Sequence, residues 1–381
     1  MPARHPLAIA TLVCLTALPA VALDSTVNSD KGRLRVATFA QGLDRPWGLD
    51  FLPDGRILVT ERAGRLRLVG TDGKVSPPIA GIPAVDARGQ GGLLDVTLHP
   101  QFASNRWVYL SYAEPGIDGT NGTAAARGRL AEDGTRLTDV TVVFRQEPKL
   151  PSTLHFGSRI VFDPAGGMYV TTGERSFDRF REQAQDLNSL LGKVVRLTDD
   201  GRVPPDNPFV GRPGARPEVW SYGHRNIQGA TIDPRTGKLW TIEHGPRGGD
   251  EITIPEPGRN YGWPVVSHGV NYSGTPIGSG KTSAPGMEDP IHTWTPVIAP
   301  GGMTFYTANL FPQWRGNLLI AGLVAQAVVR LELDGNKVVR EERLLRGLGQ
   351  RVRDVAIGPD GAVYAITDEN NGEIWRITPA L

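Results

Sequence analysis

The stretch Val355-Ala-Ile-Gly-Pro-Asp-Gly-Ala-Val-Tyr-Ala-Ile366 contains the pattern that decides the fold. One apolar run leads into a Gly-Pro-Asp-Gly turn, and a second apolar run follows directly. This arrangement is typical of a β-hairpin, because Pro and Gly supply the backbone angles that a tight reversal needs. The same unit recurs at 48–61, 94–112, 159–171, 230–242 and, least regularly, 303–320.

Six copies of one hairpin unit predict an all-β protein, a six-bladed β-propeller with four-stranded antiparallel blades. Further apolar strands follow several of the hairpins, at 66–69, 193–197, 328–331 and 373–377. The segment 34–39 precedes the first unit, and we expect it to supply the outer strand of the last blade and close the ring. A β-sandwich is the alternative, but it does not explain six copies of one unit.

Composition excludes several other classes. The chain has 47 Gly and 31 Pro in 381 residues, scattered without a G-X-Y period, which excludes collagen and disfavours a helical bundle. Hydrophobic residues make up 39% of the chain, enough for a sizeable core. The formal net charge of +1 gives no general attraction to nucleic acid or to an anionic membrane. Any anion site must therefore be a local cluster.

The first 22 residues have the features of a secretory signal peptide. Arg4 and His5 form a weakly basic start, an apolar stretch covers 7–18, and Ala20-Val21-Ala22 is a small-x-small cleavage site. An N-terminal membrane anchor is the alternative reading, but the apolar stretch is shorter than the roughly 20 residues that a span needs. We therefore expect a bacterial periplasmic or secreted protein.

Cleavage would remove the only cysteine, Cys14, so the mature chain would form no disulfide. We expect a linker over 23–33 and a catalytic propeller domain over 34–381. No segment beyond the signal peptide is apolar enough to span a bilayer.

Polar residues recur at one phase of the repeat. In a propeller, equivalent strand ends converge at the mouth of a central channel, which is a usual place for a ligand site. The residues at this phase are Arg45, Gln90, His155, Arg225, Asn226, Arg351 and Arg353. The loop Glu243-His-Gly-Pro-Arg-Gly-Gly-Asp-Glu251 should return to the same face.

Several arginines that face one pocket imply a polyanionic ligand with planar carboxylates or phosphates. The chain has no Walker loop, no GxGxxG before a helix and no zinc-type histidine pair, so neither a nucleotide nor zinc is indicated. The oxygen-rich loop 243–251 favours a hard cation such as Ca²⁺. The alternative is that these polar residues simply fill loops. Four cationic side chains at one phase of the repeat, in a nearly neutral protein, argue against this alternative.

These motifs together resemble the soluble PQQ-dependent aldose sugar dehydrogenases of the glucose/sorbosone dehydrogenase family. The matching stretches are Arg45-Pro-Trp-Gly48, Gly89-Gln-Gly-Gly-Leu-Leu94, His155-Phe-Gly-Ser-Arg159, Ser221-Tyr-Gly-His-Arg-Asn-Ile-Gln-Gly229, Glu243-His-Gly-Pro246 with Asp250-Glu251, Asn260-Tyr-Gly-Trp-Pro264, Asn271-Tyr-Ser-Gly274 and Arg351-Val-Arg-Asp-Val355. They span essentially the whole mature chain. The resemblance implies oxidation of the C1 hydroxyl of aldose sugars to lactones, with PQQ and Ca²⁺ as cofactors and an external electron acceptor that the sequence does not identify.

The resemblance also implies roles for the polar residues. His155 would be the general base that takes the proton of the C1 hydroxyl while the C1 hydride passes to PQQ. Arg225 would stabilise negative charge on the quinone oxygen. Gln90 and Asn226 would bind sugar and cofactor. The carboxylates of PQQ would bind to Arg351 and Arg353.

Two calcium sites are implied by the same resemblance. The backbone carbonyls of Gly245 and Pro246 would hold a catalytic Ca²⁺ that acts as a Lewis acid. Glu251 and the backbone of Tyr261 would hold a structural Ca²⁺. Tyr272 is a further candidate for a sugar contact.

Two positions depart from the family pattern. Val324 stands where the family usually has a lysine, and a lost charge-assisted contact of about 1.5–3 kcal/mol would weaken PQQ binding roughly ten- to a hundredfold. His244 stands where some members have glutamine. Two other functions stay open: a PQQ-free sugar- or polymer-binding propeller, which Val324 favours, and a Ca²⁺-dependent sugar lactonase, which the arginine cluster disfavours.

Overall fold

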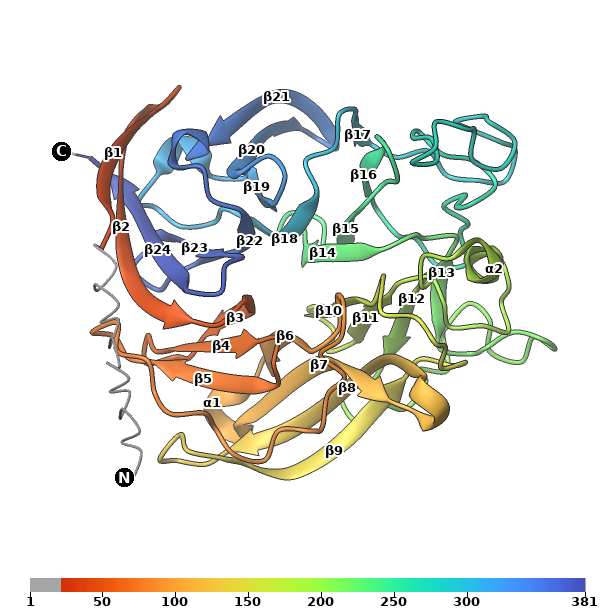
Figure 1. Ribbon diagram of the computed structural model, residues 1–381, viewed down its shortest axis with the longest axis horizontal. Helices are drawn as coiled ribbons and strands as arrows, with labels where there is room; N and C mark the ends of the chain where they lie inside the picture. Colours follow the sequence, from red (N-terminus) through yellow and green to blue (C-terminus); the bar gives the residue numbers. More distant parts are fainter. Residues whose placement is uncertain (1–21, 381) are drawn as a thin grey trace, which may run out of the picture.

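The computed structural model describes residues 22–380. The predicted signal peptide, except its last residue, and Cys14 lie outside this range. Within it, six antiparallel sheets form a ring around a central axis (Figure 1). The repeated hairpins therefore predicted the architecture correctly, a six-bladed β-propeller.

Each blade begins with an inner strand at the channel and runs outward as a meander. Four blades, the second to the fifth, have the predicted four strands. The second consists of β6 (Leu93–Leu98), β7 (Trp107–Pro115), β8 (Asn121–Leu130) and β9 (Leu137–Arg145), and the third of β10 (Gly157–Phe162), β11 (Met168–Thr172), β12 (Lys193–Leu197) and β13 (Val219–Tyr222). The fourth consists of β14 (Ile227–Ile232), β15 (Leu239–Glu243), β16 (Asp250–Thr253) and β17 (His292–Trp294), and the fifth of β18 (Pro300–Phe305), β19 (Leu318–Gly322), β20 (Ala327–Asp334) and β21 (Lys337–Leu344). The first blade consists of β3 (Pro46–Phe51), β4 (Ile57–Glu61) and β5 (Arg65–Val69). The last blade consists of β22 (Val352–Ile357), β23 (Val363–Thr367), β24 (Gly372–Pro379), β2 (Gly32–Leu43) and β1 (Asp24–Ser29).

Two details differ from the sequence prediction. The outer edge of the first blade is held by single bridges, Leu66 with Ile79 and Val69 with Val75, in place of a regular fourth strand. The segment 23–33 was expected to be a linker, but most of it is strand β1, which pairs antiparallel with β2 and adds a fifth strand to the last blade. Its polar sequence hid the strand, because only one edge of β1 is paired and its side chains alternate between exposed and half-buried.

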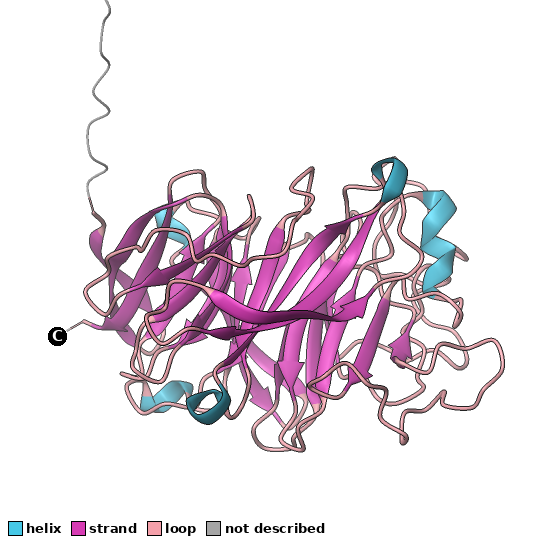
Figure 2. Ribbon diagram, turned by 90° about the horizontal axis from the view of Figure 1, so that it is seen from below, coloured by secondary structure: helices cyan, strands magenta, loops and turns pink. Residues whose placement is uncertain are grey.

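Helices contribute little to the described structure. They are α1 (Phe102–Asn105) and α2 (Asp178–Arg181), with the 3₁₀ turns η1 (Ile117–Gly119), η2 (Glu182–Ala184), η3 (Pro312–Trp314) and η4 (Arg346–Leu348). Figure 2 shows that helices and long loops gather at the two ends of the strands. Across residues 22–380, no helix has the length and apolar character needed to cross a membrane.

The turn between β22 and β23 shows why the repeated sequence forms hairpins. Gly361 has a φ of +77°, a conformation that costs glycine little. The Asp360 carboxylate accepts the N–H of Ala362 at 3.1 Å, and the N–H of Gly358 donates to the carbonyl of Ala362 at 2.9 Å. The chain therefore reverses tightly and leaves the two apolar runs paired.

Neighbouring blades pack against each other through apolar side chains. The cluster between the fifth and sixth blades includes Leu319, Val328, Val355, Val363 and Trp375. The second strand of a blade, such as β23, is buried along its whole length, because other blades cover both of its faces. This explains why the second strand of each hairpin reads as a continuous apolar run.

The ring is closed by strands from the two ends of the chain. Strand β2 pairs antiparallel with β24, from Leu34 opposite Pro379 to Leu43 opposite Gly372, so the predicted closing segment does pair with the last blade. Val36 of β2 is completely buried in the cluster between the fifth and sixth blades. Closure therefore rests on side-chain burial as well as on backbone hydrogen bonds.

We expect Val36→Asp to lower the free energy of unfolding by about 3–5 kcal/mol, because it buries an unpaired carboxylate at the closing strand. Urea unfolding followed by circular dichroism measures the change. Arg33→Asp is the control, since Arg33 lies on the same strand and is exposed. Its change should stay below about 0.5 kcal/mol, and equal losses in the two variants would contradict the closing role of Val36.

Candidate active site

One end of the central channel opens into a cavity of about 290 Å³. Each blade contributes residues from the start of its inner strand or the end of its second strand, as the repeat phase predicts. The lining residues are Trp47, Arg62, Gln90, His155, Arg225, Asn226, Gln228, His244, Gly245, Tyr272, Ala299, Leu323, Val324, Arg351, Arg353 and Asp368.

The structure brings most of the predicted residues to this cavity. Those that line it are Gln90, His155, Arg225, Asn226, Gly245, Tyr272, Arg351 and Arg353. Pro246, Glu251 and Tyr261 line a much smaller adjoining cavity of about 20 Å³, which also touches Arg225 and Gly245. Arg45 was expected at the channel mouth, but it does not line the cavity; its exposed guanidinium donates to Asn370 Oδ1 at 2.6 Å.

His155 is fixed at the start of the third blade. Its Nδ1 lies 2.6 Å from Oε2 of the buried Glu174, and its backbone N–H donates to Gln90 Oε1 at 2.9 Å. Because a carboxylate can only accept, Nδ1 carries the proton, and Nε2 has a free lone pair when the ring is neutral. Burial lowers the pKa of His155 below its ordinary value, although Glu174 opposes the shift. A neutral His155 could therefore accept a proton at Nε2.

Four arginines and one aspartate set the charge of the cavity. Asp368 Oδ2 pairs with Arg351 at 3.0 Å and with Arg353 at 3.1 Å. Arg225 instead donates to the carbonyls of His244 and Gly245, at 2.7 and 2.8 Å. With Arg62, the four arginines and Asp368 leave a formal charge of 4 − 1 = +3 on the lining residues. Such a cavity suits a ligand with several carboxylates.

Gln228 connects two of the lining side chains. Its Oε1 accepts from Arg353 Nη1 at 2.9 Å and lies 3.1 Å from Nε2 of His244. Burial, together with the charges of Arg353 and Arg225, holds the pKa of His244 well below its ordinary value. His244 is therefore neutral, and its Nε2–H donates to Gln228.

Glu243 positions the backbone beside the cavity. Its Oε2 accepts the N–H of Arg225 and, at 3.2 Å, the N–H of Asn226. Asn226 Oδ1 in turn accepts the N–H of Gly157 at 3.0 Å, next to the strand that follows His155. This buried carboxylate therefore fixes two cavity residues relative to the base.

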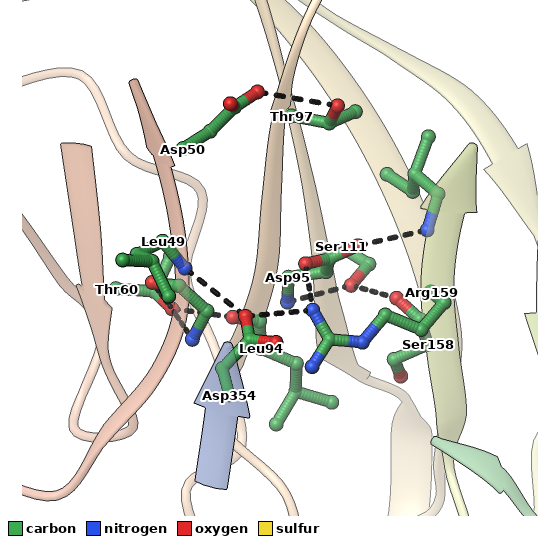
Figure 3. A network of polar contacts seen from close by, with 12 residues as sticks. Leu49, Asp50, Thr60, Leu94, Asp95, Thr97, Ser111, Ser158, Arg159 and Asp354 are labelled. Atoms are coloured by element: carbon green, nitrogen blue, oxygen red, sulfur yellow. Dashed lines mark hydrogen bonds and ion pairs between the residues drawn. The ribbon is translucent and has the colours of Figure 1, made fainter. Parts of the chain in front are cut away.

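A buried ion-pair network joins the inner strands of the second, third and sixth blades (Figure 3). Arg159 Nη1 lies 2.7 Å from Asp95 Oδ1 and 3.0 Å from Asp354 Oδ2. Its Nε donates to the carbonyl of Gln228 at 2.7 Å, and its guanidinium lies 4.4 Å from the ring centre of Trp47. These three charged side chains line a second cavity, of about 450 Å³, and not the one that His155 lines.

The sequence profile described as Glucose / Sorbosone dehydrogenase matches residues 43–376, almost the whole propeller. The chain belongs to this family. Aldose sugar dehydrogenase YliI from Escherichia coli strain K12 is 46% identical over 364 residues, which make up 95% of this chain and 97% of that protein.

Solved structures of the dehydrogenase family have the same fold. The apo-form of the soluble aldose sugar dehydrogenase from Escherichia coli superposes with a TM-score of 0.88 at 47% identity and covers 91% of this chain and 100% of its own. The PQQ-bound form of aldose sugar dehydrogenase from Streptomyces coelicolor superposes with a TM-score of 0.72 at 29% identity, covering 95% of this chain and 100% of its own. Together with the family match, these relatives support a dehydrogenase.

Calcium would have to use mainly backbone oxygens in this dehydrogenase. Among residues 22–380, no three His, Cys, Asp or Glu side chains converge into a metal centre. Within the same range, the carbonyl of Pro246 accepts no hydrogen bond, whereas that of Gly245 accepts one from Arg225. In the smaller cavity, burial and the neighbouring Glu243 carboxylate raise the pKa of Glu251 well above its ordinary value. A cation there would relieve this repulsion.

Sequence reasoning missed several residues that complete the site. They are Trp47, Arg62, Glu174, Gln228 and Asp368. A signal for two of them exists, because an acid ends or closely follows the second strand of the hairpin in the first, third, fourth and sixth units. These acids are Glu61, Glu174, Glu243 and Asp368. The ends of the second strands therefore place carboxylates at the channel mouth, where the starts of the first strands place histidine and arginine side chains.

We expect Arg159→Met to lower the free energy of unfolding by about 3–5 kcal/mol near neutral pH, because it leaves two buried carboxylates without their cation. Burial already raises the pKa of Asp95 to about 6. A carboxyl whose folded pKa exceeds the unfolded value of about 3.9 stabilises the fold only while it is protonated. Loss of Arg159 raises this pKa further, so the deficit relative to wild type should shrink as the pH falls toward about 6.

Urea unfolding at several pH values measures this deficit. Arg340→Met is the matched control, since Arg340 pairs with Asp30 on the surface, and its effect should stay below about 1 kcal/mol. A deficit in Arg159→Met that stays constant or grows on acidification would contradict the charge argument.

Proposed function

We propose that this chain oxidises the C1 hydroxyl of aldose sugars to the lactone, with PQQ and Ca²⁺ as cofactors. The observation that carries the proposal is a base, His155 held by Glu174, at the wall of a cavity whose lining residues have a formal charge of +3. The names of the relatives, an aldose sugar dehydrogenase and its PQQ-bound form, agree with it. The periplasmic location expected from the first 22 residues belongs to the same proposal.

The cavity suits PQQ in charge and in chemistry. PQQ is a flat quinone with three carboxylates, which match the three uncompensated positive charges of the lining. The buried Nε atoms of Arg225 and Arg353 have no hydrogen-bond partner among residues 22–380, so donors remain for a ligand. When bound, PQQ supplies the ortho-quinone that accepts the hydride, a chemistry that no side chain can supply.

The protein's own part in the reaction is to position the sugar and move a proton. Nε2 of His155 takes the proton of the C1 hydroxyl, and Glu174 keeps the ring in the orientation and tautomer that this step needs. The charge of Glu174 also stabilises the imidazolium that forms. Gln90 and Asn226 orient polar groups of the bound molecules, and Arg225 provides positive charge beside the reacting atoms.

A calcium ion would lie at the carbonyls of Gly245 and Pro246 and act as a Lewis acid. Gly245 O accepts from Arg225 at 2.8 Å, and its second lone pair could bind the ion. A second ion would lie at Glu251 and the backbone of Tyr261, beside Glu243. Both positions combine hard oxygen donors with local negative or partial negative charge.

We expect aldose-dependent dye reduction only after reconstitution with both PQQ and Ca²⁺, and loss of activity on treatment with a chelator. Hexoses, pentoses and disaccharides form the panel of substrates. Inactivity toward all of them despite spectroscopically bound PQQ would overturn the proposal. Hydrolysis of gluconolactone without PQQ would favour a lactonase instead.

We expect the acid limb of the pH profile of kcat/KM to lie below pH 6.5, the ordinary value for histidine, because burial lowers the pKa of His155. Glu174→Gln removes a negative charge that raises this pKa, so the limb should move to still lower pH. The maximal rate should fall roughly ten- to a hundredfold as ring orientation and imidazolium stabilisation are lost.

Glu182→Gln is the control for this profile, since Glu182 is an exposed carboxylate in the same loop region. It should leave the profile unchanged. A limb that moves to higher pH in Glu174→Gln would contradict the assignment of His155 as the titrating base.

A further inference from the structure

Arg62 differs from the other charged residues of the cavity. It directly follows β4 in the first blade and lines the cavity. Arg351 and Arg353 share the carboxylate of Asp368, whereas Arg62 forms no ion pair with any residue in the described range. Burial lowers the pKa of Arg62, and the charges of Arg353 and Arg45 add to the shift, whereas Asp368 and Asp44 oppose it.

The guanidinium of Arg62 is held on one side only. Its Nε donates to the carbonyl of Gly91 at 3.2 Å, and its Nη2 donates to the carbonyl of Gly89. Among residues 22–380, its Nη1 donates to no protein atom. Since the backbone carbonyls fix the plane of the group, Nη1 is a donor held in place and available to a ligand.

The two carbonyls that hold Arg62 flank Gln90, whose Oε1 accepts the backbone N–H of His155. Arg62 is therefore hydrogen-bonded to the segment 89–91, and Gln90 in this segment is hydrogen-bonded to the backbone of His155. A ligand group that pairs with Arg62 lies on the same cavity wall as Gln90.

The wall formed by the fifth blade carries no charge. It consists of Ala299, Leu323 and Val324, and Val324 is 57% exposed toward the opening. Cations come only from the first, fourth and sixth blades. With Arg225 of the fourth blade beside the reacting atoms, the cations that remain for carboxylates are the aspartate-linked pair of the sixth blade and Arg62 of the first.

We propose that Arg62 is a carboxylate-binding residue of this cavity and pairs through Nη1 with one carboxylate of PQQ. The proposal rests on the proposed function. It adds a cation on the wall of the first blade, whereas the wall of the fifth blade, with Val324, offers none. The free Nη1 and the absence of a carboxylate partner in the described structure distinguish Arg62 from an arginine that only braces a loop.

Equilibrium titration of the purified protein with PQQ, in the presence of Ca²⁺ and without sugar, tests the proposal by fluorescence quenching. We expect Arg62→Gln to raise the Kd for PQQ roughly ten- to a hundredfold, as the loss of one charge-assisted contact predicts. Arg62→Lys keeps the charge and should lose clearly less. Arg45→Gln is the matched control, because it removes a nearby positive charge that does not line the cavity; its Kd should change by less than about threefold.

The neutral trimethyl ester of PQQ separates charge pairing from loop support. Wild type and Arg62→Gln should bind this ester equally, because it offers no carboxylate. Equal losses for PQQ and its ester, equal losses in Arg45→Gln and Arg62→Gln, or an unchanged Kd in Arg62→Gln would each overturn the role of Arg62 while leaving the proposed function intact. Failure of the wild-type protein itself to bind PQQ would overturn both.

Discussion

The pairing of β2 with β24 is the constraint on which the rest of the structure depends. It joins the two ends of the described chain in one sheet and fixes the last blade against the first. A closed ring forces the inner strands of all six blades around one axis, so residues far apart in sequence meet at the channel mouth. His155 and Arg353, for example, line one cavity only because the circle is complete.

Different parts of the channel carry different charges, although the chain as a whole is nearly neutral. At one end, the cavity lining carries four arginines and one aspartate. Further along the axis, Arg159 is enclosed by Asp95 and Asp354, with which it pairs. The buried network pairs one arginine with two carboxylates, whereas the Nε atoms of Arg225 and Arg353 in the cavity have no hydrogen-bond partner among residues 22–380. A single fold thus separates charges that stabilise it from charges that remain available for binding.

Much of the fold and part of the site could be predicted from the sequence. The turn at Gly358–Gly361 and its five counterparts identified the blades, and polar residues before the inner strands identified His155 and Arg225. The partner of His155 was not predicted, because Glu174 follows a second strand, and which strand ends meet depends on the pairing of β10 with β11. Strand β1 was assigned to a linker, since its polar sequence gives no periodic apolar signal.

The sequence by itself determined the repeat, the number of blades and the face on which polar residues gather, because hairpin turns and strand periodicity are local properties. Only the tertiary structure decided which charges neutralise each other. Asp368 compensates Arg351 and Arg353, whereas Arg62 is held by carbonyls and keeps its charge. Such pairing depends on distances between side chains at the ends of different strands, which no local pattern encodes.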